Sequence, residues 1–261
     1  MPSTRINGLD LYYEDTGGSG PVLLFSHGFL MDTDMWAPQV AALRGRYRCI
    51  AWDERGFGRT GPVKDPFSYW DSARDALGLL QHLNVATATW IGLSQGGFLA
   101  MRAALLEPAR VKALVLISTR AGLDTQETVD NFKGLRAEWA QNGSANVHGM
   151  LGEILLGKER ADPNPWFAKW AAMSKDALAY PIDALTGRDD LTPRLSELRC
   201  PALVIHGDAD MAIDVAHGES LAKGLPNCQG FVRVTGAGHA PNLTHPEIVN
   251  PPLGEFLARF A

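Results

Sequence analysis

Residues 88–106 decide the fold, and they read ATWIGLSQGGFLAMRAALL. The run before the glycines is apolar and β-prone, and the run after them is rich in helix-forming residues. Between the two runs, Gly92-x-Ser94-x-Gly96 has the spacing of a strand that turns sharply into a helix. Ser94 needs a strained backbone there, and side chains at either glycine would clash with the crossing strand and helix. The pattern predicts a serine hydroxyl raised above the edge of a sheet, close to the first N–H groups of a helix.

Composition narrows the class of protein. The chain has 261 residues, of which 46% are hydrophobic and 20% charged, an ordinary balance for one large α/β domain or one domain with an insertion. The net charge of −5 argues against a general nucleic-acid or anionic-membrane surface. No segment is apolar for long enough to span a bilayer, and Met1–Arg5 carries no apolar signal core. Three cysteines fit reduced thiols better than a disulfide framework, so we expect a cytoplasmic protein.

Apolar runs and helical stretches alternate along most of the chain. Asn7-Gly8 between alternating residues predicts an N-terminal hairpin. The expected strands that follow are residues 22–25, 48–52, 88–91, 111–118, 202–207 and 231–234. The expected helices lie near residues 35–43, 68–83, 98–106, 216–224 and 246–260. Continuously apolar strands that alternate with helices predict a mostly parallel central sheet covered by helices on both faces.

The alternation stops between residues 122 and 195. No long apolar strand occurs there, and tryptophan, methionine, leucine and phenylalanine are interspersed with prolines and glycines. We expect a helical insertion at 122–195, and a core formed by residues 1–121 and 196–261.

A serine hydroxyl is a weak nucleophile at neutral pH and needs a base together with a group that orients the base. In an open α/β sheet the loops after the strands share one edge, so these partners should follow other strands. Asp210 follows the strand that ends at Gly207, and His239 follows the strand that ends at Val234. Asp208 and Asp124 are alternative candidates for the acid.

Five motifs extend this pattern over the chain. They are His27-Gly28-Phe29, Asp53-x-Arg55-Gly56-x-Gly58, Gly92-x-Ser94-x-Gly96-Gly97, Gly207-x-x-Asp210 and Gly236-x-Gly238-His239. With these motifs the chain resembles the α/β-hydrolase family over essentially its whole length, and most of all its esterase, enol-lactonase and cofactor-free haloperoxidase branch. The resemblance implies that Ser94 is the nucleophile, His239 the general base and Asp210 the orienting carboxylate. It also implies an oxyanion hole made by the backbone N–H groups of Phe29 and Gln95, and a cap domain at 122–195.

Serine at position 94 predicts acyl transfer through an acyl-enzyme, with a small to medium carboxylic ester or lactone and water as the reactants. Alternatives on the same three residues are hydrolytic carbon–carbon cleavage and perhydrolysis, and an alternative of another class is a non-catalytic binding protein with this fold. We expect Phe29, Gln95, Trp139 and Trp166 to contact substrate. No nucleotide-binding glycine loop and no zinc-like ligand spacing occurs in the sequence, so neither a cofactor nor a metal is expected. Oligomeric state stays open.

Overall fold

One mixed β-sheet organises the molecule, as seen in a computed structural model that describes residues 3–157 and 165–261. Met1, Pro2 and the part of the predicted insertion at 158–164 lie outside the described residues. The strands are β1 Ser3–Ile6, β2 Leu9–Asp15, β3 Val22–Ser26, β4 Arg48–Trp52, β5 Ala88–Leu93, β6 Val111–Ile117, β7 Ala202–Gly207 and β8 Cys228–Val234. Their spatial order is β1-β2-β4-β3-β5-β6-β7-β8.

The sheet is antiparallel only at its N-terminal edge. β1 pairs with β2 and β2 pairs with β4 in antiparallel fashion, whereas all later pairings are parallel. The β1–β2 turn is the predicted Asn7-Gly8 pair, with φ of 45° and 84°, which are the left-handed values that a type I′ hairpin turn requires. The predicted mostly parallel sheet is therefore confirmed.

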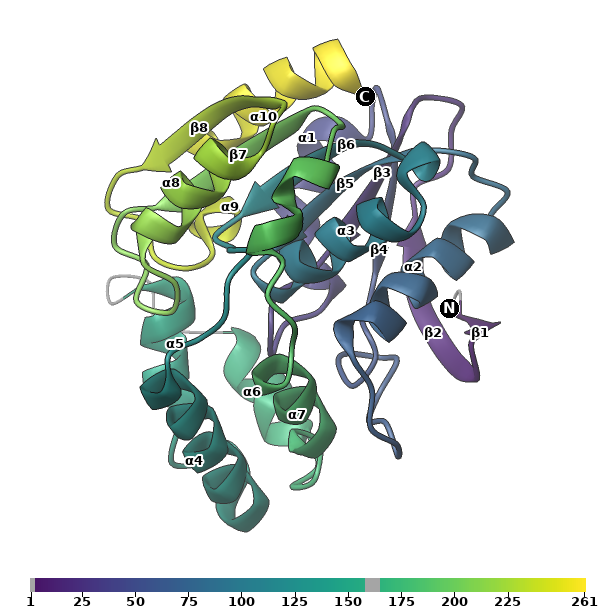
Figure 1. Ribbon diagram of the computed structural model, residues 1–261. Coiled ribbons are helices and arrows are strands. Elements are labelled where there is room, and N and C mark those ends of the chain that lie inside the picture. Colours follow the sequence, from purple (N-terminus) through teal and green to yellow (C-terminus); the bar gives the residue numbers. More distant parts are fainter. Residues whose placement is uncertain (1–2, 158–164) are drawn as a thin grey trace.

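Helices cover both faces of the sheet (Figure 1). α2 Tyr69–His82, α3 Gln95–Leu106 and α8 Val215–Gly224 lie on the face toward the viewer. α1 Ala37–Leu43 and α10 Pro246–Phe260 pack together behind it. This cover leaves the central strands β5 and β7 without an exposed residue, which explains why both read as continuous apolar runs.

The helix expected near residues 35–43 is two elements. A 3₁₀ turn, η1 Thr33–Trp36, precedes α1, and the side chain of Asp32 accepts the N–H of Asp34 at 3.0 Å to cap it. Short 3₁₀ turns also precede β6 and β7, at η2 Pro108–Arg110 and η4 Thr192–Glu197, and the short helix α9 Pro241–Thr244 precedes α10.

The segment between β6 and β7 is helical in the described residues, as expected. It contains α4 Gln126–Asn142, α5 His148–Leu156, α6 Pro165–Ala172 and α7 Ala179–Thr186. We call α4–α7 the insertion helices, and Figure 1 shows them grouped beyond one end of the sheet. Within the described ranges, no helix combines the length and the apolarity needed to cross a membrane.

Candidate active site

Ser94 sits at the turn between β5 and α3 in a strained conformation. Its φ is 54° and its ψ is −115°, a region that non-glycine residues rarely occupy. Four hydrogen bonds to Ser94 hold the turn. The N–H of Ser94 donates to Ile117 O at 2.9 Å, and its carbonyl accepts from the Thr119 hydroxyl at 2.8 Å and from the N–H groups of Gly97 at 2.9 Å and Phe98 at 3.2 Å. Neighbouring strand ends therefore fix the position of the hydroxyl.

The glycines flanking Ser94 are required by close backbone approaches. A Cβ at Gly92 would lie 2.3 Å from the carbonyl oxygen of Gly96, and a Cβ at Gly96 would lie 2.1 Å from that of Ser26. Real Cβ atoms do not come so near to backbone, so both positions exclude every other residue. The steric argument from the sequence is confirmed at both positions.

His239 and Asp210 form a buried hydrogen-bonded pair. His239 Nδ1 lies 2.8 Å from Asp210 Oδ2, and the side chains are 4% and 0% exposed. The other carboxylate oxygen accepts the backbone N–H groups of Ala212 at 2.8 Å and Ile213 at 3.0 Å. Because an ionised carboxylate only accepts, His239 must carry its proton on Nδ1, which leaves Nε2 free to take a proton.

The protein keeps Asp210 ionised despite its burial. Burial alone would raise the pKa of Asp210, but the electrostatic interaction with His239 and the hydrogen bonds from His206, His239 and Ile213 outweigh it. The pKa of Asp210 therefore lies well below its ordinary value. His206 contributes through Nε2, which lies 3.2 Å from Asp210 Oδ2 and 2.8 Å from Ile213 O.

The two alternative acids have other partners. Asp208 is exposed and accepts the backbone N–H of Gly236 at 2.7 Å. Asp124 is buried and forms ion pairs with Arg120 and Arg188. Of the three candidates, only Asp210 lies within hydrogen-bond distance of His239 in the described structure.

The loop after β3 lies against the Ser94 turn. A Cβ on Gly28 would come within 3.8 Å of Ser94 Cβ, so the two backbones are close neighbours. Gly28 O accepts the N–H of Met31 at 3.1 Å and lies 2.8 Å from His27 Nδ1. His27 is fully buried, which lowers its pKa, and its Nε2 accepts the N–H of Glu54 at 2.9 Å. A neutral His27 therefore ties this loop to the loop after β4.

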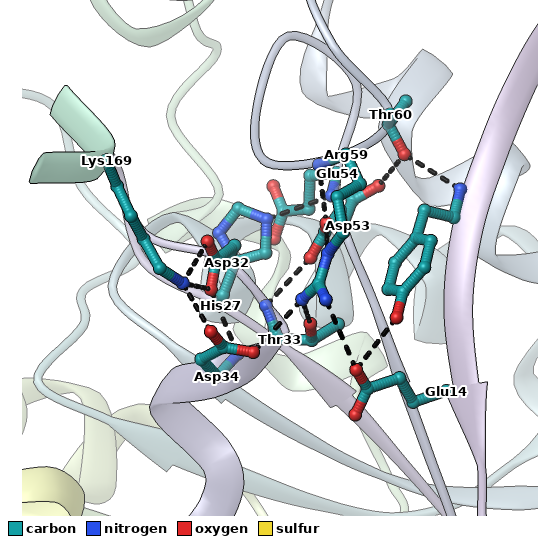
Figure 2. Close-up of polar contacts among 11 residues, drawn as sticks. Glu14, His27, Asp32, Thr33, Asp34, Asp53, Glu54, Arg59, Thr60 and Lys169 are labelled. Carbon is teal, nitrogen blue, oxygen red and sulfur yellow. Dashed lines mark hydrogen bonds and ion pairs between the residues drawn. The ribbon is translucent and has the colours of Figure 1, made fainter. Parts of the chain in front are cut away.

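A polar network continues from this loop toward the protein surface (Figure 2). The buried carboxylate of Asp53 accepts the backbone N–H groups of Thr33 and Arg59, each at 2.7 Å. On the opposite side, Lys169 of α6 reaches Asp32 at 2.6 Å and Asp34 at 2.5 Å. The network thus connects an insertion helix to the loop beside Ser94.

A cavity of about 560 Å³ opens above Ser94 and His239, and both residues line it. Its walls come from the β3 loop, the β6 and β7 loops and the insertion helices α4, α5 and α7. The apolar part of the lining is Phe29, Leu30, Phe98, Phe132, Leu135, Val147, Met150, Leu151, Ile154, Leu155, Leu185, Met211, Ala212 and Ile213. The volume and the apolar lining with a few polar groups are typical of small-molecule sites.

The model of the α/β hydrolase fold family matches residues 21–246. The chain belongs to the α/β-hydrolase family. A protein from a Synechocystis species, provisionally named a non-heme chloroperoxidase, is 33% identical, with 95% of each chain covered. A thermophilic esterase from Thermogutta terrifontis is 30% identical with a TM-score of 0.87, covering 98% of this chain and 96% of that one. An enol-lactonase from Burkholderia xenovorans LB400 is 26% identical with a TM-score of 0.90, covering 98% of this chain and all of that one.

Only one of the four side chains expected to contact substrate lies in the cavity of this hydrolase. Phe29 lines it and stacks edge-on against Phe132 of α4, with ring centroids 5.9 Å apart. Gln95, Trp139 and Trp166 are absent from its described lining, which corrects the expectation for these three side chains.

Each of these three side chains is buried elsewhere. Gln95 is 1% exposed and turns into the core, where its amide donates to Glu54 at 2.9 Å. Burial raises the pKa of that Glu54 carboxyl well above its ordinary value. Trp139 donates from Nε1 to Ser174 O at 3.1 Å, inside the insertion helices. Trp166 is 3% exposed, and its ring lies 4.5 Å from the Nζ of Lys169.

The sequence did not indicate two charged clusters near the site of this hydrolase. One is the buried cluster of Arg120, Asp124 and Arg188, of which only Asp124 was considered, as an alternative acid; Arg120 and Asp124 line the cavity. The other is Lys169 with Asp32 and Asp34. Asp32 and Asp34 stand just after the His27-Gly28-Phe29 motif, and that position was the only signal, because Lys169 lies more than a hundred residues away. Within the described ranges, no three His, Cys, Asp or Glu side chains are grouped to hold a metal ion.

Proposed function

We propose that this enzyme is a serine hydrolase that cleaves small to medium carboxylic esters or lactones through an acyl-enzyme on Ser94. The observation that carries the proposal is the 2.8 Å hydrogen bond from His239 to Asp210, beside a cavity that both Ser94 and His239 line. A base with a fixed tautomer that lines the same cavity as a hydroxyl on a strained turn supports nucleophilic catalysis by serine.

The reaction follows from these positions. The Ser94 Oγ attacks the carbonyl carbon, and His239 Nε2 takes the hydroxyl proton. The carbonyl π electrons move to oxygen, and the backbone N–H groups of Phe29 and Gln95 stabilise that charge. His239 then protonates the leaving alcohol as the acyl-enzyme forms. Water, deprotonated by His239, releases the acid and restores Ser94. Oxyanion donors are important here, because one donor alone changes the barrier by about 3 kcal/mol.

The donor at Phe29 is suited to this role. Within residues 3–157 and 165–261, its N–H donates to no other group of the protein. The N–H of Gln95 is at the first position of α3, where helix geometry leaves N–H groups without an intrahelical acceptor. Both groups belong to backbone adjoining Ser94, so neither requires a particular side chain.

The cavity favours an apolar substrate. Its described lining is dominated by aliphatic and aromatic side chains, with the polar groups Arg120, Asp124, Thr128, Asn131 and Glu138 among them. The insertion helices supply much of this wall, and we propose that they act as a cap that selects the substrate. The relatives are consistent with ester or lactone chemistry, since one is an esterase and another an enol-lactonase.

The proposal is tested by covalent labelling and a substrate panel. A fluorophosphonate should phosphonylate purified enzyme at Ser94 with loss of fluoride, detected as a single added mass that maps to the peptide containing Ser94. Acetate to octanoate p-nitrophenyl esters and γ- and δ-lactones should turn over. Absence of both labelling and turnover would leave a non-catalytic binding protein as the better account.

The same panel distinguishes the rival reactions. Perhydrolysis replaces water by hydrogen peroxide in the second step, so peracid would form from an ester only when peroxide is added. Carbon–carbon hydrolysis would cleave a diketone at a rate above that of every ester and lactone. One relative carries the name chloroperoxidase, so the assay with added hydrogen peroxide should be part of the panel. Either result would replace the ester or lactone assignment while keeping Ser94 as nucleophile.

A further inference from the structure

The loop that carries Phe29 contains a turn that is unfavourable for its own sequence. The Met31 N–H donates to Gly28 O at 3.1 Å, which closes a four-residue turn over Phe29 and Leu30. Leu30 has φ of 62°, a left-handed value at a turn position that favours glycine. A leucine there is strained and persists only when surrounding contacts hold it.

This turn sets the direction of the proposed oxyanion donor. A peptide unit is planar and trans, so the Phe29 N–H points opposite to the Gly28 carbonyl. Any group that fixes the Gly28 carbonyl therefore also aims the Phe29 N–H. On the core side, the fixing groups are the N–H of Met31 and the imidazole of His27, at 3.1 and 2.8 Å from Gly28 O.

Helix α6 holds the turn from the other side. Trp170 is 1% exposed and donates from Nε1 to Leu30 O at 2.7 Å, so the strained residue is bonded directly. Lys169, the preceding residue, contacts both oxygens of Asp32, at 2.7 and 2.6 Å, and reaches Asp34 at 2.5 Å. Figure 2 shows the ammonium between these two carboxylates, which lie on the segment that leaves the turn.

The Lys169–Asp32 contact differs from an ordinary surface ion pair. The Asp32 side chain is only 9% exposed and that of Lys169 is 34% exposed. A buried carboxylate needs a positive partner, so removing the ammonium takes away the ion pair of Asp32, while the N–H of Asp34 still donates to it. The segment from Leu30 to Asp34 should then relax toward solvent, and the turn with it.

We propose that Trp170 and Lys169 are positioning residues that aim the Phe29 N–H at the oxyanion, so that an insertion helix completes the catalytic machinery. The inference rests on the function proposed above. It gives α6 a role in transition-state stabilisation, whereas a cap that only shapes the pocket would influence substrate binding.

The test separates transition-state effects from binding effects. The variants are Trp170→Phe, which keeps an aromatic ring and removes the donor, and Lys169→Met, which keeps the alkyl chain and removes the charge. For p-nitrophenyl butyrate, kcat should fall about 10- to 100-fold, since a displacement of about 1 Å can lower a rate by 10². KM should stay within about twofold of the wild-type value, because the contacts that bind the substrate and the transition state equally are unchanged.

An alkyl trifluoromethyl ketone reports on the oxyanion directly. Ser94 Oγ bonds to its carbonyl carbon, the π electrons move to oxygen, and the serine proton passes to His239. The inhibition constant should rise in proportion to the loss of kcat/KM, because this adduct needs the same N–H. Lys169→Arg should restore most of the activity, since it returns the positive charge to Asp32.

Two control variants exist in the same segment, one at Trp139 in α4 and one at Lys175 between α6 and α7. Trp139→Phe removes a Nε1 donor from a fully buried tryptophan that bonds Ser174 O, and Lys175→Met removes a lysine that bonds Gln141 O. Neither partner belongs to the turn, so kcat and the inhibition constant should stay at wild-type values in both controls.

The outcomes separate the two proposals. Unchanged kcat and inhibitor affinity in both Trp170→Phe and Lys169→Met would overturn this inference while leaving serine catalysis intact. Equal losses of kcat in the two control variants would also overturn it, and so would a change in KM without a change in kcat. Either result would indicate that Trp170 and Lys169 act only through general packing of the protein. Wild-type enzyme that neither hydrolyses the ester nor binds the ketone would remove the proposed function, and this inference with it.

Discussion

Ser94→Ala is expected to lower ester turnover by about 10⁶-fold, the size of loss seen when a serine protease loses its nucleophile. The reason is that the proposed mechanism forms the bond to the carbonyl carbon at Ser94 Oγ, and no other hydroxyl is held on the strained turn. The measurement is kcat on the best ester of the panel, together with fluorophosphonate labelling, which should vanish. The turn itself should persist, because the four hydrogen bonds to residue 94 use its backbone atoms.

An unchanged thermal unfolding profile would serve as the control for Ser94→Ala. Alanine has the same backbone preferences as serine at this φ, so stability should change by less than about 1 kcal/mol. Turnover near the wild-type rate in a correctly folded variant would contradict the proposed mechanism, because it would place the nucleophile elsewhere.

Asp210→Asn is expected to lower kcat by up to about 10⁴-fold, by analogy with other triads. The surroundings of residue 210 give the reason. One carboxylate oxygen accepts the N–H groups of Ala212 and Ile213, so the amide oxygen of asparagine should take that place. The NH₂ group then faces His239 Nδ1, which must accept, and the histidine proton moves to Nε2. A protonated Nε2 cannot take the proton of Ser94.

Asp208→Asn is the matched comparison. Asp208 is exposed, two residues away, and within the described residues its side chain accepts a backbone N–H of Gly236, so activity should remain within about twofold of wild type. A larger loss in Asp208→Asn than in Asp210→Asn would show that the acid is assigned to the wrong residue.

The parts of the fold that follow from local chemistry were predictable from sequence. The hairpin at Asn7-Gly8 and the turn at Gly92-Leu93-Ser94 depend on backbone conformations that a few residue types allow. The parallel sheet followed from continuously apolar strands. The start of the helix expected at residue 35 was less predictable, because a 3₁₀ turn capped by Asp32 precedes it and short 3₁₀ segments leave little periodicity.

The residues of the candidate site also differ in how far the sequence could predict them. Asp210 and His239 could be placed because parallel strands deliver their loops to one sheet edge, and the structure brings these two side chains together. Gln95 was misjudged because its backbone adjoins Ser94 while its side chain turns into the core toward Glu54. The contact between Lys169 and Asp32 joins residues 137 positions apart, and no local pattern indicates which distant helix will meet a loop.

The φ of 54° at Ser94 has a consequence for anyone who engineers this protein. Glycine adopts that conformation freely, so Ser94→Gly should be more stable than Ser94→Ala by about 1–2 kcal/mol, after allowing for the greater freedom of glycine in the unfolded chain. Calorimetry of the two inactive variants would measure the difference as a higher melting temperature for the glycine form. Selection for thermal resistance alone would thus tend to replace the proposed nucleophile, so screens on this scaffold should also measure activity.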